Sequence, residues 1–211
     1  VSVRGAVALG ITLSLLSVIW LESQVNTLSA LFAAGAIVFY VCIYTLLLKR
    51  RTSSNIVWGG AAGCFPVLIG WSAVTNSISL APIVLFMIVF WWTPPHYWPL
   101  SMQYRSDYES AGIPMLPVVA DRIKVANQIA IYSWIMTSTT LILPFVSNLS
   151  FVYVIGAVVL NAVFLKEVYA LKNRAKSSAE EINPMKLFNW SITYLALLFF
   201  LIGLDPLLNL N

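Results

Sequence analysis

The chain has 211 residues, of which 60% are hydrophobic and 9% are charged, and its mean hydropathy is +0.86. A soluble domain carries roughly 25% charged residues, so this composition excludes a soluble globular protein and predicts a membrane protein. The net charge of +4 is not accompanied by a basic patch that alternates with exposed aromatic residues, and we expect no nucleic-acid binding.

Seven apolar stretches are long enough to cross a bilayer, which takes about 20 residues in a helix. They cover residues 6–21, 28–48, 56–74, 80–98, 125–145, 151–169 and 187–208. The sequence therefore predicts an all-α fold, a polytopic transmembrane helical bundle, with residues 1–211 in a single domain. Because the first residue is Val1 and the first stretch follows Arg4 closely, we also expect the chain to continue a longer protein.

The 12 basic residues are confined to alternate connections between these stretches. They are Arg4, Lys49, Arg50, Arg51, Arg105, Arg122, Lys124, Lys166, Lys172, Arg174, Lys176 and Lys186. By the positive-inside rule these connections face the cytoplasm, or the matrix of an organelle. The opposite connections are only a few residues long, so a functional site is expected to open on the basic side.

Polar residues follow the second stretch, where Tyr40 and Tyr44 precede the basic run and Asn55 opens the third stretch. Tyr40, Tyr44, Arg51 and Asn55 are compatible with one helical face, which would form the wall of a pocket. The alternative is a positive-inside cluster flanked by interfacial tyrosines, with Asn55 as a helix N-cap.

Three glycines, Gly59, Gly60 and Gly63, lie in the next segment. Small residues let transmembrane helices approach closely, so helix packing is the first interpretation. A pocket wall that must admit a bulky ligand is the second interpretation.

The segment from Phe90 to Trp98 contains five aromatic residues and His96, the only histidine of the chain. Thr93 followed by Pro94 predicts that a new helix begins there, and Gly112 predicts its end. If this helix covers residues 94–111, the side chains of His96, Gln103 and Asp107 share one face. His96 and Asp107 would then lie about 16 Å apart along the axis. Alternatively, Asp107 is a loop charge and His96 an interfacial histidine.

These residue types suit one kind of chemistry. Carboxylates with Mg²⁺, together with Lys and Arg, suit a diphosphate. The faces of Trp and Tyr rings suit a carbocation. Together they indicate transfer of a prenyl group from a prenyl diphosphate within the membrane.

Several sequence blocks also occur in a specific order. They are residues 44–52 (YTLLLKRRT), 55–63 (NIVWGGAAG), 92–98 (WTPPHYW), 107–119 (DYESAGIPMLPVV) and 188–205. In these blocks the chain resembles the protoheme IX farnesyltransferase (heme O synthase) family of UbiA-type intramembrane prenyltransferases. The resemblance implies a fold of nine spans, of which this chain holds the last seven. It also implies transfer of a farnesyl group from farnesyl diphosphate to a vinyl group of heme b, giving heme O for terminal oxidase assembly.

The resemblance assigns roles to residues at matching positions. Asp107 would bind Mg²⁺ and diphosphate, and Lys49, Arg50 and Arg105 would offset the charge of the leaving diphosphate. Seven further residues would line the substrate pocket, with His96 on the heme side. These are His96, Asn55, Trp92, Tyr97, Trp98, Tyr104 and Gln103.

The chain departs from the family at two places. The first acidic motif of the family is absent from the chain, and Ser106 stands where relatives often carry a second acid. We therefore expect the chain alone to insert into a membrane without farnesylating heme.

Two other functions fit the same residues. One is a quinone-type aromatic prenyltransferase, and the other is a heme or lipid carrier without catalytic activity. The family resemblance favours the cell membrane of a bacterium over the mitochondrial inner membrane. Candidate protein partners are heme A synthase and oxidase assembly factors.

Overall fold

A computed structural model describes residues 2–177 and 182–208, which form helices joined by short connections and contain no strand. The helices are α1 (Val3–Gln24), α2 (Thr27–Val38), the π-helical segment η1 (Phe39–Leu48), α3 (Asn55–Thr75), α4 (Leu80–Gln103), α5 (Arg105–Ser110), α6 (Leu116–Val119), α7 (Arg122–Val146), α8 (Phe151–Lys176) and α9 (Met185–Leu208).

The seven predicted spans are confirmed within the described part of the chain. Each apolar stretch forms a helix of 21 to 26 residues that is long and apolar enough to cross a membrane, with α2 and η1 together making the second. Polar caps define where several begin. For example, the backbone N–H of Lys124 donates to Asp121 Oδ1 at 2.8 Å, at the start of α7.

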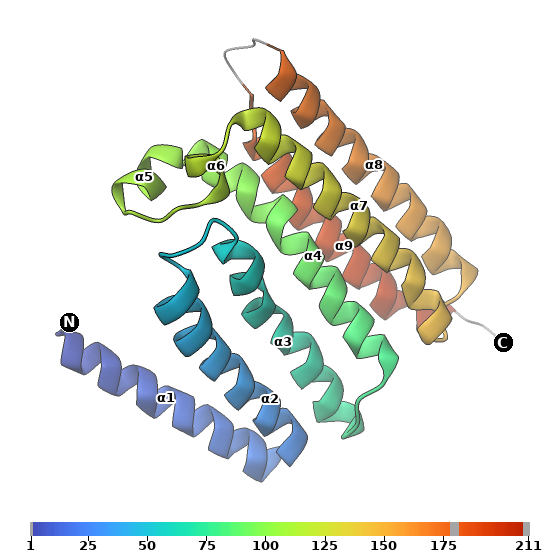
Figure 1. Ribbon diagram of the computed structural model, residues 1–211. Helices are drawn as coiled ribbons and strands as arrows, with labels where there is room; N and C mark the ends of the chain where they lie inside the picture. The colour runs from blue at the N-terminus through green and yellow to red at the C-terminus, as the bar shows by residue number, and fades with distance from the viewer. Residues whose placement is uncertain (1, 178–181, 209–211) are drawn as a thin grey trace.

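The helices fall into two groups that share α4 (Figure 1). Helices α4, α7, α8 and α9 form a closed four-helix bundle, because each packs against two of the others. Helices α3, α2 and α1 extend from α4 as a row in which each one packs on the next. Helix α1 contains no buried residue, so the outer edge of this row is open.

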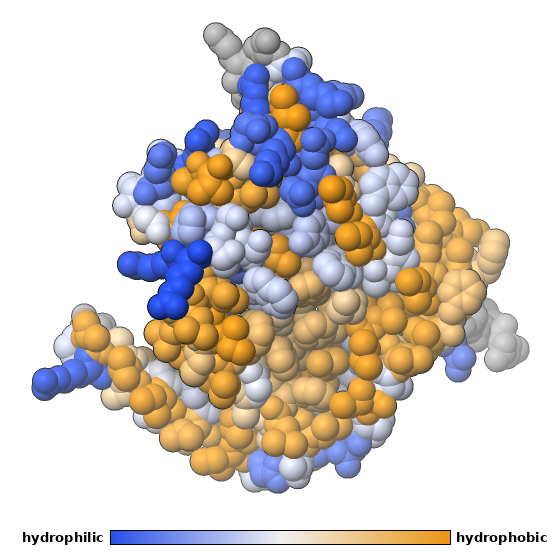
Figure 2. Space-filling model, viewed as in Figure 1, coloured by the Kyte–Doolittle hydropathy of each residue, from blue (hydrophilic) through white to orange (hydrophobic). Residues whose placement is uncertain are grey.

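The polar residues gather at one end of the helices (Figure 2). Figure 2 shows hydrophilic side chains around the end that carries α5 and α6, and mainly hydrophobic side chains over the middle of the visible face. The beginnings of α1 and α9, the end of α8 and the connections η1–α3 and α4–α7 all lie toward this end (Figure 1). These are the parts of the chain near which the sequence places the basic residues.

The prediction that a new helix begins at Thr93–Pro94 is wrong. Helix α4 continues from Leu80 to Gln103 with Pro94, Pro95 and Pro99 inside it. Each proline removes one backbone N–H from the helix. Just before them, the side chain of Thr93 makes an additional bond within the helix, since its Oγ1 donates to the carbonyl of Val89 at 3.0 Å. Prolines are tolerated here because packed neighbouring helices hold the segment in place.

The prediction of one polar stripe through residues 94–111 is also wrong. Helix α4 ends at Gln103, and a separate helix α5 begins at Arg105, so His96 and Asp107 do not share a helix face. The predicted stop at Gly112 is confirmed, since its φ is 64°. The N–H groups of Gly112 and Ile113 donate to the carbonyls of Glu109 and Tyr108, which closes the end of α5.

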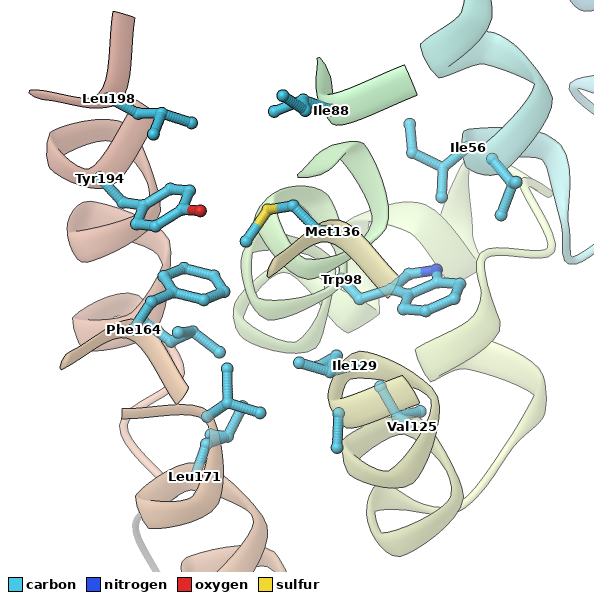
Figure 3. Close-up of a cluster of buried hydrophobic side chains, with 14 of the residues drawn as sticks. Ile56, Ile88, Trp98, Val125, Ile129, Met136, Phe164, Leu171, Tyr194 and Leu198 are labelled. Atoms are coloured by element: carbon cyan, nitrogen blue, oxygen red, sulfur yellow. The ribbon is translucent and has the colours of Figure 1, made fainter. Parts of the chain in front are cut away.

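The core lies inside the four-helix bundle. Figure 3 shows Trp98 of α4, Met136 of α7, Phe164 of α8 and Tyr194 of α9 among the side chains that meet there. Lipid chains are as apolar as these residues, so polar contacts are needed to fix how the helices pair. Asn161 supplies them: its Oδ1 accepts from Tyr194 Oη at 2.7 Å and its Nδ2 donates to Thr140 Oγ1 at 2.9 Å.

A buried carboxylate closes the opposite end of the bundle. Asp205 of α9 is fully buried and accepts hydrogen bonds from the backbone N–H groups of Ser150 and Tyr153, at 2.7 and 3.0 Å. The Ser150 hydroxyl donates to the same carboxylate. Asp205 therefore caps the beginning of α8 from another helix.

Candidate functional site

A cavity of about 410 Å³ opens between η1, α3, α4 and the segment that carries α5 and α6. Its lining includes four tyrosines and one lysine, and we call it the tyrosine cavity. Its lining residues are Tyr40, Tyr44, Lys49, Ile56, Gly59, Gly60, Gly63, Val89, Trp92, Thr93, Tyr97, Tyr108, Ile113 and Met115.

Two glycines of α3 bring the walls of this cavity together. A Cβ atom on Gly59 would lie 2.5 Å from Tyr44 Cε2, and one on Gly60 would lie 2.6 Å from Thr93 Cγ2. The helix-packing interpretation is therefore confirmed for Gly59 and Gly60, since any side chain would push η1 or α4 away from α3.

Phenols and one ammonium group surround the open space. The Tyr40 and Tyr44 rings lie 5.4 Å apart between centroids, and Lys49 Nζ lies 6.0 Å from the Tyr44 ring centroid. Burial raises the pKa of Tyr108, and the neighbouring Tyr97 raises it further. The Tyr108 phenol is therefore neutral at pH 7, and the cation of Lys49 sets the charge of the cavity.

A second cavity of about 410 Å³ adjoins the first between α3, α4 and α9, and we call it the apolar cavity. None of the described residues that line it is charged. It is lined by Gly63, Val67, Val89, Trp92, Ile192, Leu195, Ala196 and Phe199. The two cavities share three lining residues, Gly63, Val89 and Trp92. The tyrosine cavity, which is charged and aromatic, therefore adjoins the apolar cavity, which is lined mainly by hydrocarbon side chains.

Three of the predicted site residues, Lys49, Trp92 and Tyr97, line the tyrosine cavity. Asn55 lies directly behind Lys49. It is fully buried at the first turn of α3, and its Nδ2 donates to the Lys49 carbonyl at 3.1 Å. Because the chain turns between η1 and α3, Asn55 and Arg51 do not continue the helix face of Tyr40 and Tyr44. Asn55 instead fixes the backbone from which Lys49 projects.

His96 lies between α4 and α9. Its ring is stacked between Trp92 and Phe188, with centroid distances of 4.1 and 4.6 Å, and its Nδ1 lies 2.7 Å from Ser191 Oγ. The Ser191 hydroxyl donates to the Phe188 carbonyl, so the proton between His96 and Ser191 belongs to Nδ1. His96 therefore presents Nε2 as an acceptor.

Two of the predicted aromatic residues lie away from the tyrosine cavity. Trp98 is 3% exposed and packs edge to face on Tyr132 of α7, inside the bundle. Tyr104 is exposed at the break between α4 and α5. Neither lines the tyrosine or the apolar cavity.

Gln103 and Arg105 line a different cavity, of about 620 Å³, formed where α4, α6, α7 and α9 meet at the polar end. Arg105 Nη2 donates to the carbonyl of Val118 at 3.2 Å. The structure therefore separates these two residues from Lys49, although the sequence grouped them.

The predicted metal ligand Asp107 lies exposed on α5. Within residues 2–177 and 182–208, no group of three or more His, Cys, Asp or Glu side chains could hold a metal ion. Mg²⁺ takes only one or two protein carboxylates when a phosphate supplies further oxygens. The residues present therefore fit one ligand position, at Asp107.

Sequence reasoning left several cavity residues out of the predicted site. Tyr40 and Tyr44 were noticed by their spacing of four residues, but Tyr108, Ile113 and Met115 were not assigned to it. The segment 107–119 was recognised as a specific block, and that signal points to these residues without showing which of them face inward.

The chain is similar in sequence to a known family and to named proteins of that family. The UbiA prenyltransferase family matches residues 1–203. The chain is 50% identical over 211 residues to a protein named protoheme IX farnesyltransferase from Streptomyces avermitilis, covering 99% of the chain and 69% of that relative. Proteins of the same name from Streptomyces coelicolor and Cutibacterium acnes are both 52% identical, over 95% and 98% of the chain and 64% and 62% of their own lengths.

The chain thus spans about two thirds of the length of these relatives. No solved structure matches it. The match over nearly the whole chain, together with a bundle of apolar helices around a charged and aromatic cavity, identifies the family: the chain belongs to the UbiA prenyltransferase family.

Proposed function

We propose that the chain forms the larger part of an enzyme that transfers a farnesyl group from farnesyl diphosphate to a vinyl group of heme b. The observation that supports this function best is the pair of adjoining cavities, one with a lysine and four tyrosines and the other made of hydrocarbon side chains. A prenyl diphosphate has the same two parts, a charged head and a long apolar tail.

Lys49 is the cation best placed for the diphosphate. It lines the tyrosine cavity, and Asn55 holds its backbone carbonyl. Arg50 and Arg105 lie at the same polar end of the helices but outside the tyrosine cavity, and we assign them to longer-range compensation of the charge that develops on the leaving diphosphate. Asp107 would hold Mg²⁺ together with phosphate oxygens, and the ion would offset the same negative charge.

The tyrosine rings are suited to the other half of the substrate. When the bond between C1 of the farnesyl group and the diphosphate oxygen breaks, positive charge develops on the allylic carbons. The negative faces of the Tyr44 and Tyr97 rings stabilise that charge. C1 then bonds to the terminal carbon of the vinyl group, and the cation left beside the porphyrin takes hydroxide from water and releases a proton, which gives heme O.

His96 is the candidate for the heme side of the site. Its ring is held between Trp92 and Phe188, and Nε2 is the nitrogen that can act toward a ligand. Trp92 lines both cavities beside it, so a porphyrin near His96 would lie next to the prenyl group. Trp98, Tyr104 and Gln103 would act through the surrounding structure.

We further propose that activity requires the third of the relatives' length that the chain does not match. A diphosphate brings several negative charges into a site of low dielectric, where uncompensated charge costs several kcal/mol. Asp107 is exposed and does not itself line the tyrosine cavity, although its neighbour Tyr108 does, and Glu109 two positions away faces another side of α5. Asp107 is therefore the one described carboxylate that we assign to Mg²⁺.

Production of heme O in a membrane without an endogenous synthase tests both proposals. We would compare residues 1–211 with a fusion that adds to them the part of the Streptomyces avermitilis relative that the chain does not match. The fusion should form heme O and release diphosphate only with Mg²⁺, and residues 1–211 alone should insert without forming product. Heme O from residues 1–211 alone would show that one acidic residue suffices.

The same assay separates the alternatives. Farnesylation of an added quinone precursor in place of heme would indicate a quinone-type aromatic prenyltransferase. Heme binding by the fusion without release of diphosphate would indicate a carrier. We place the enzyme in a bacterial cell membrane with its polar end in the cytoplasm, where heme A synthase and oxidase assembly factors are the candidate partners.

A further inference from the structure

Gly63 stands where the tyrosine cavity meets the apolar cavity. It shares this position with Val89 and Trp92 of α4, and these three residues alone line both cavities. A ligand that occupies both cavities would therefore lie against Gly63, Val89 and Trp92.

The space at Gly63 differs from the space at the two preceding glycines. A Cβ atom on Gly59 or Gly60 would meet Tyr44 or Thr93, but a Cβ atom on Gly63 would meet nothing within 4 Å. Close helix packing therefore explains Gly59 and Gly60 and does not explain Gly63. Gly63 is itself exposed, so the space beside position 63 is open at the surface of α3 where the two cavities meet.

The dimensions of the apolar cavity match part of an isoprenoid tail. Along α9 it extends from Ile192 to Phe199, which is about 10 Å at ~1.5 Å per residue. Each isoprene unit adds four chain bonds of ~1.5 Å, or about 5 Å of extended chain. Two of the three units of a farnesyl group therefore fit in the apolar cavity, with the first unit in the tyrosine cavity.

We infer that residue 63 selects the length of the prenyl donor. Glycine lets a tail longer than one isoprene unit pass into the apolar cavity, and a larger side chain there would stop the tail and leave room for a short donor. This inference rests on the proposed prenyl transfer, and it adds the residue that decides which allylic diphosphate is used.

Gly63→Leu in the fusion that forms heme O is the test, with farnesyl diphosphate and dimethylallyl diphosphate as donors. Because a Cβ at Gly63 meets no neighbouring atom within 4 Å, the variant should fold. Its kcat/KM for farnesyl diphosphate should fall at least about 100-fold relative to that for dimethylallyl diphosphate, since several methylene-sized groups lose their pocket.

Gly70→Leu is the matched control. Gly70 lies two turns further along the same face of α3, and a Cβ there also meets nothing within 4 Å, but Gly70 lines neither cavity. Its preference between the two donors should equal that of the unchanged protein. A farnesyl analogue with a photoreactive group at the tail end should label α9 between Ile192 and Phe199, and Gly63→Leu should abolish that labelling.

The outcomes separate this inference from the proposed function. Equal kcat/KM losses for both donors, or an unchanged preference in Gly63→Leu, would overturn the inference while prenyl transfer by the parent protein stands. Failure of the parent fusion to use any allylic diphosphate would overturn the proposed function, and the inference with it.

Discussion

At the scale of single residues, the first prediction concerns Asp107. If its carboxylate holds Mg²⁺ and diphosphate, Asp107→Asn in the active fusion should lower turnover about 10²-fold or more. A contact made to charge in the transition state contributes roughly 3–4 kcal/mol. Heme binding, followed by absorbance, should not change, and Glu109→Gln should have little effect on turnover. Full turnover of Asp107→Asn at saturating Mg²⁺ would show that Asp107 is only a surface charge.

The second residue-scale prediction concerns His96. His96→Ala should weaken heme binding and shift the Soret band, with the affinity for farnesyl diphosphate nearly unchanged, because His96 does not line the tyrosine cavity that contains Lys49. Ser191→Ala is the control for loss of the hydrogen bond alone, since it removes the partner of Nδ1 and keeps the imidazole between the Trp92 and Phe188 rings. If His96→Ala lowers both affinities equally, His96 serves to hold α4 against α9.

The sequence indicated which types of residue form the site better than it indicated which of them line the same cavity. Lys49, Trp92 and Tyr97 line one cavity, because each is close to a cavity wall built by its own helix. Gln103 was placed with His96 and Asp107 on one expected helix face, and Arg105 was grouped with Lys49 through the family resemblance. The break at Tyr104 turns that segment, so they line another cavity. Such a break depends on tertiary packing, which a projection of one helix cannot contain.

At the scale of helices, Asp205 should control the stability of α8. Asp205→Ala removes the acceptor for the Ser150 and Tyr153 N–H groups and leaves both donors buried or partly buried. The free energy of unfolding should fall by about 1–3 kcal/mol. Thermal unfolding in detergent would measure this, with Ser150→Ala as a milder comparison because it keeps the backbone contacts. An unchanged unfolding temperature in Asp205→Ala would mean that water replaces the carboxylate.

Helix α4 shows why the spans were predictable but their internal structure was not. Span length and hydrophobicity follow from the thickness of a bilayer, so all seven stretches formed helices near the expected bounds. Thr93–Pro94 has the residue pattern of a helix start in water. In a bilayer an interrupted helix would expose backbone groups that lipid cannot satisfy, so the helix continues through its prolines. The π-helical turn geometry of η1 likewise leaves no mark in the residue pattern.

At the scale of the whole molecule, the segregation of basic residues predicts the orientation. In a background without Cys42 and Cys64, Gln24→Cys at the end of α1 and Asn148→Cys between α7 and α8 should react with a membrane-impermeant thiol reagent added outside the cell, since neither connection contains a basic residue. Arg51→Cys should react only after the membrane is opened. Labelling of Arg51→Cys in intact cells would reverse the proposed topology.

The two cavities lie along the seam between the four-helix bundle and the row of α1 to α3, and only α4 belongs to both groups. A bound donor would therefore touch both groups at once and tie the row to the bundle. Binding of the donor then stabilises the folded protein. At a ligand concentration of about 100 times Kd the free energy of unfolding rises by ~2.7 kcal/mol. An unreactive thio analogue of farnesyl diphosphate should accordingly protect α2 and α3 from proteolysis at concentrations that change little in α7 and α8. The donor would thus stabilise the contact between the two helix groups as well as being the substrate.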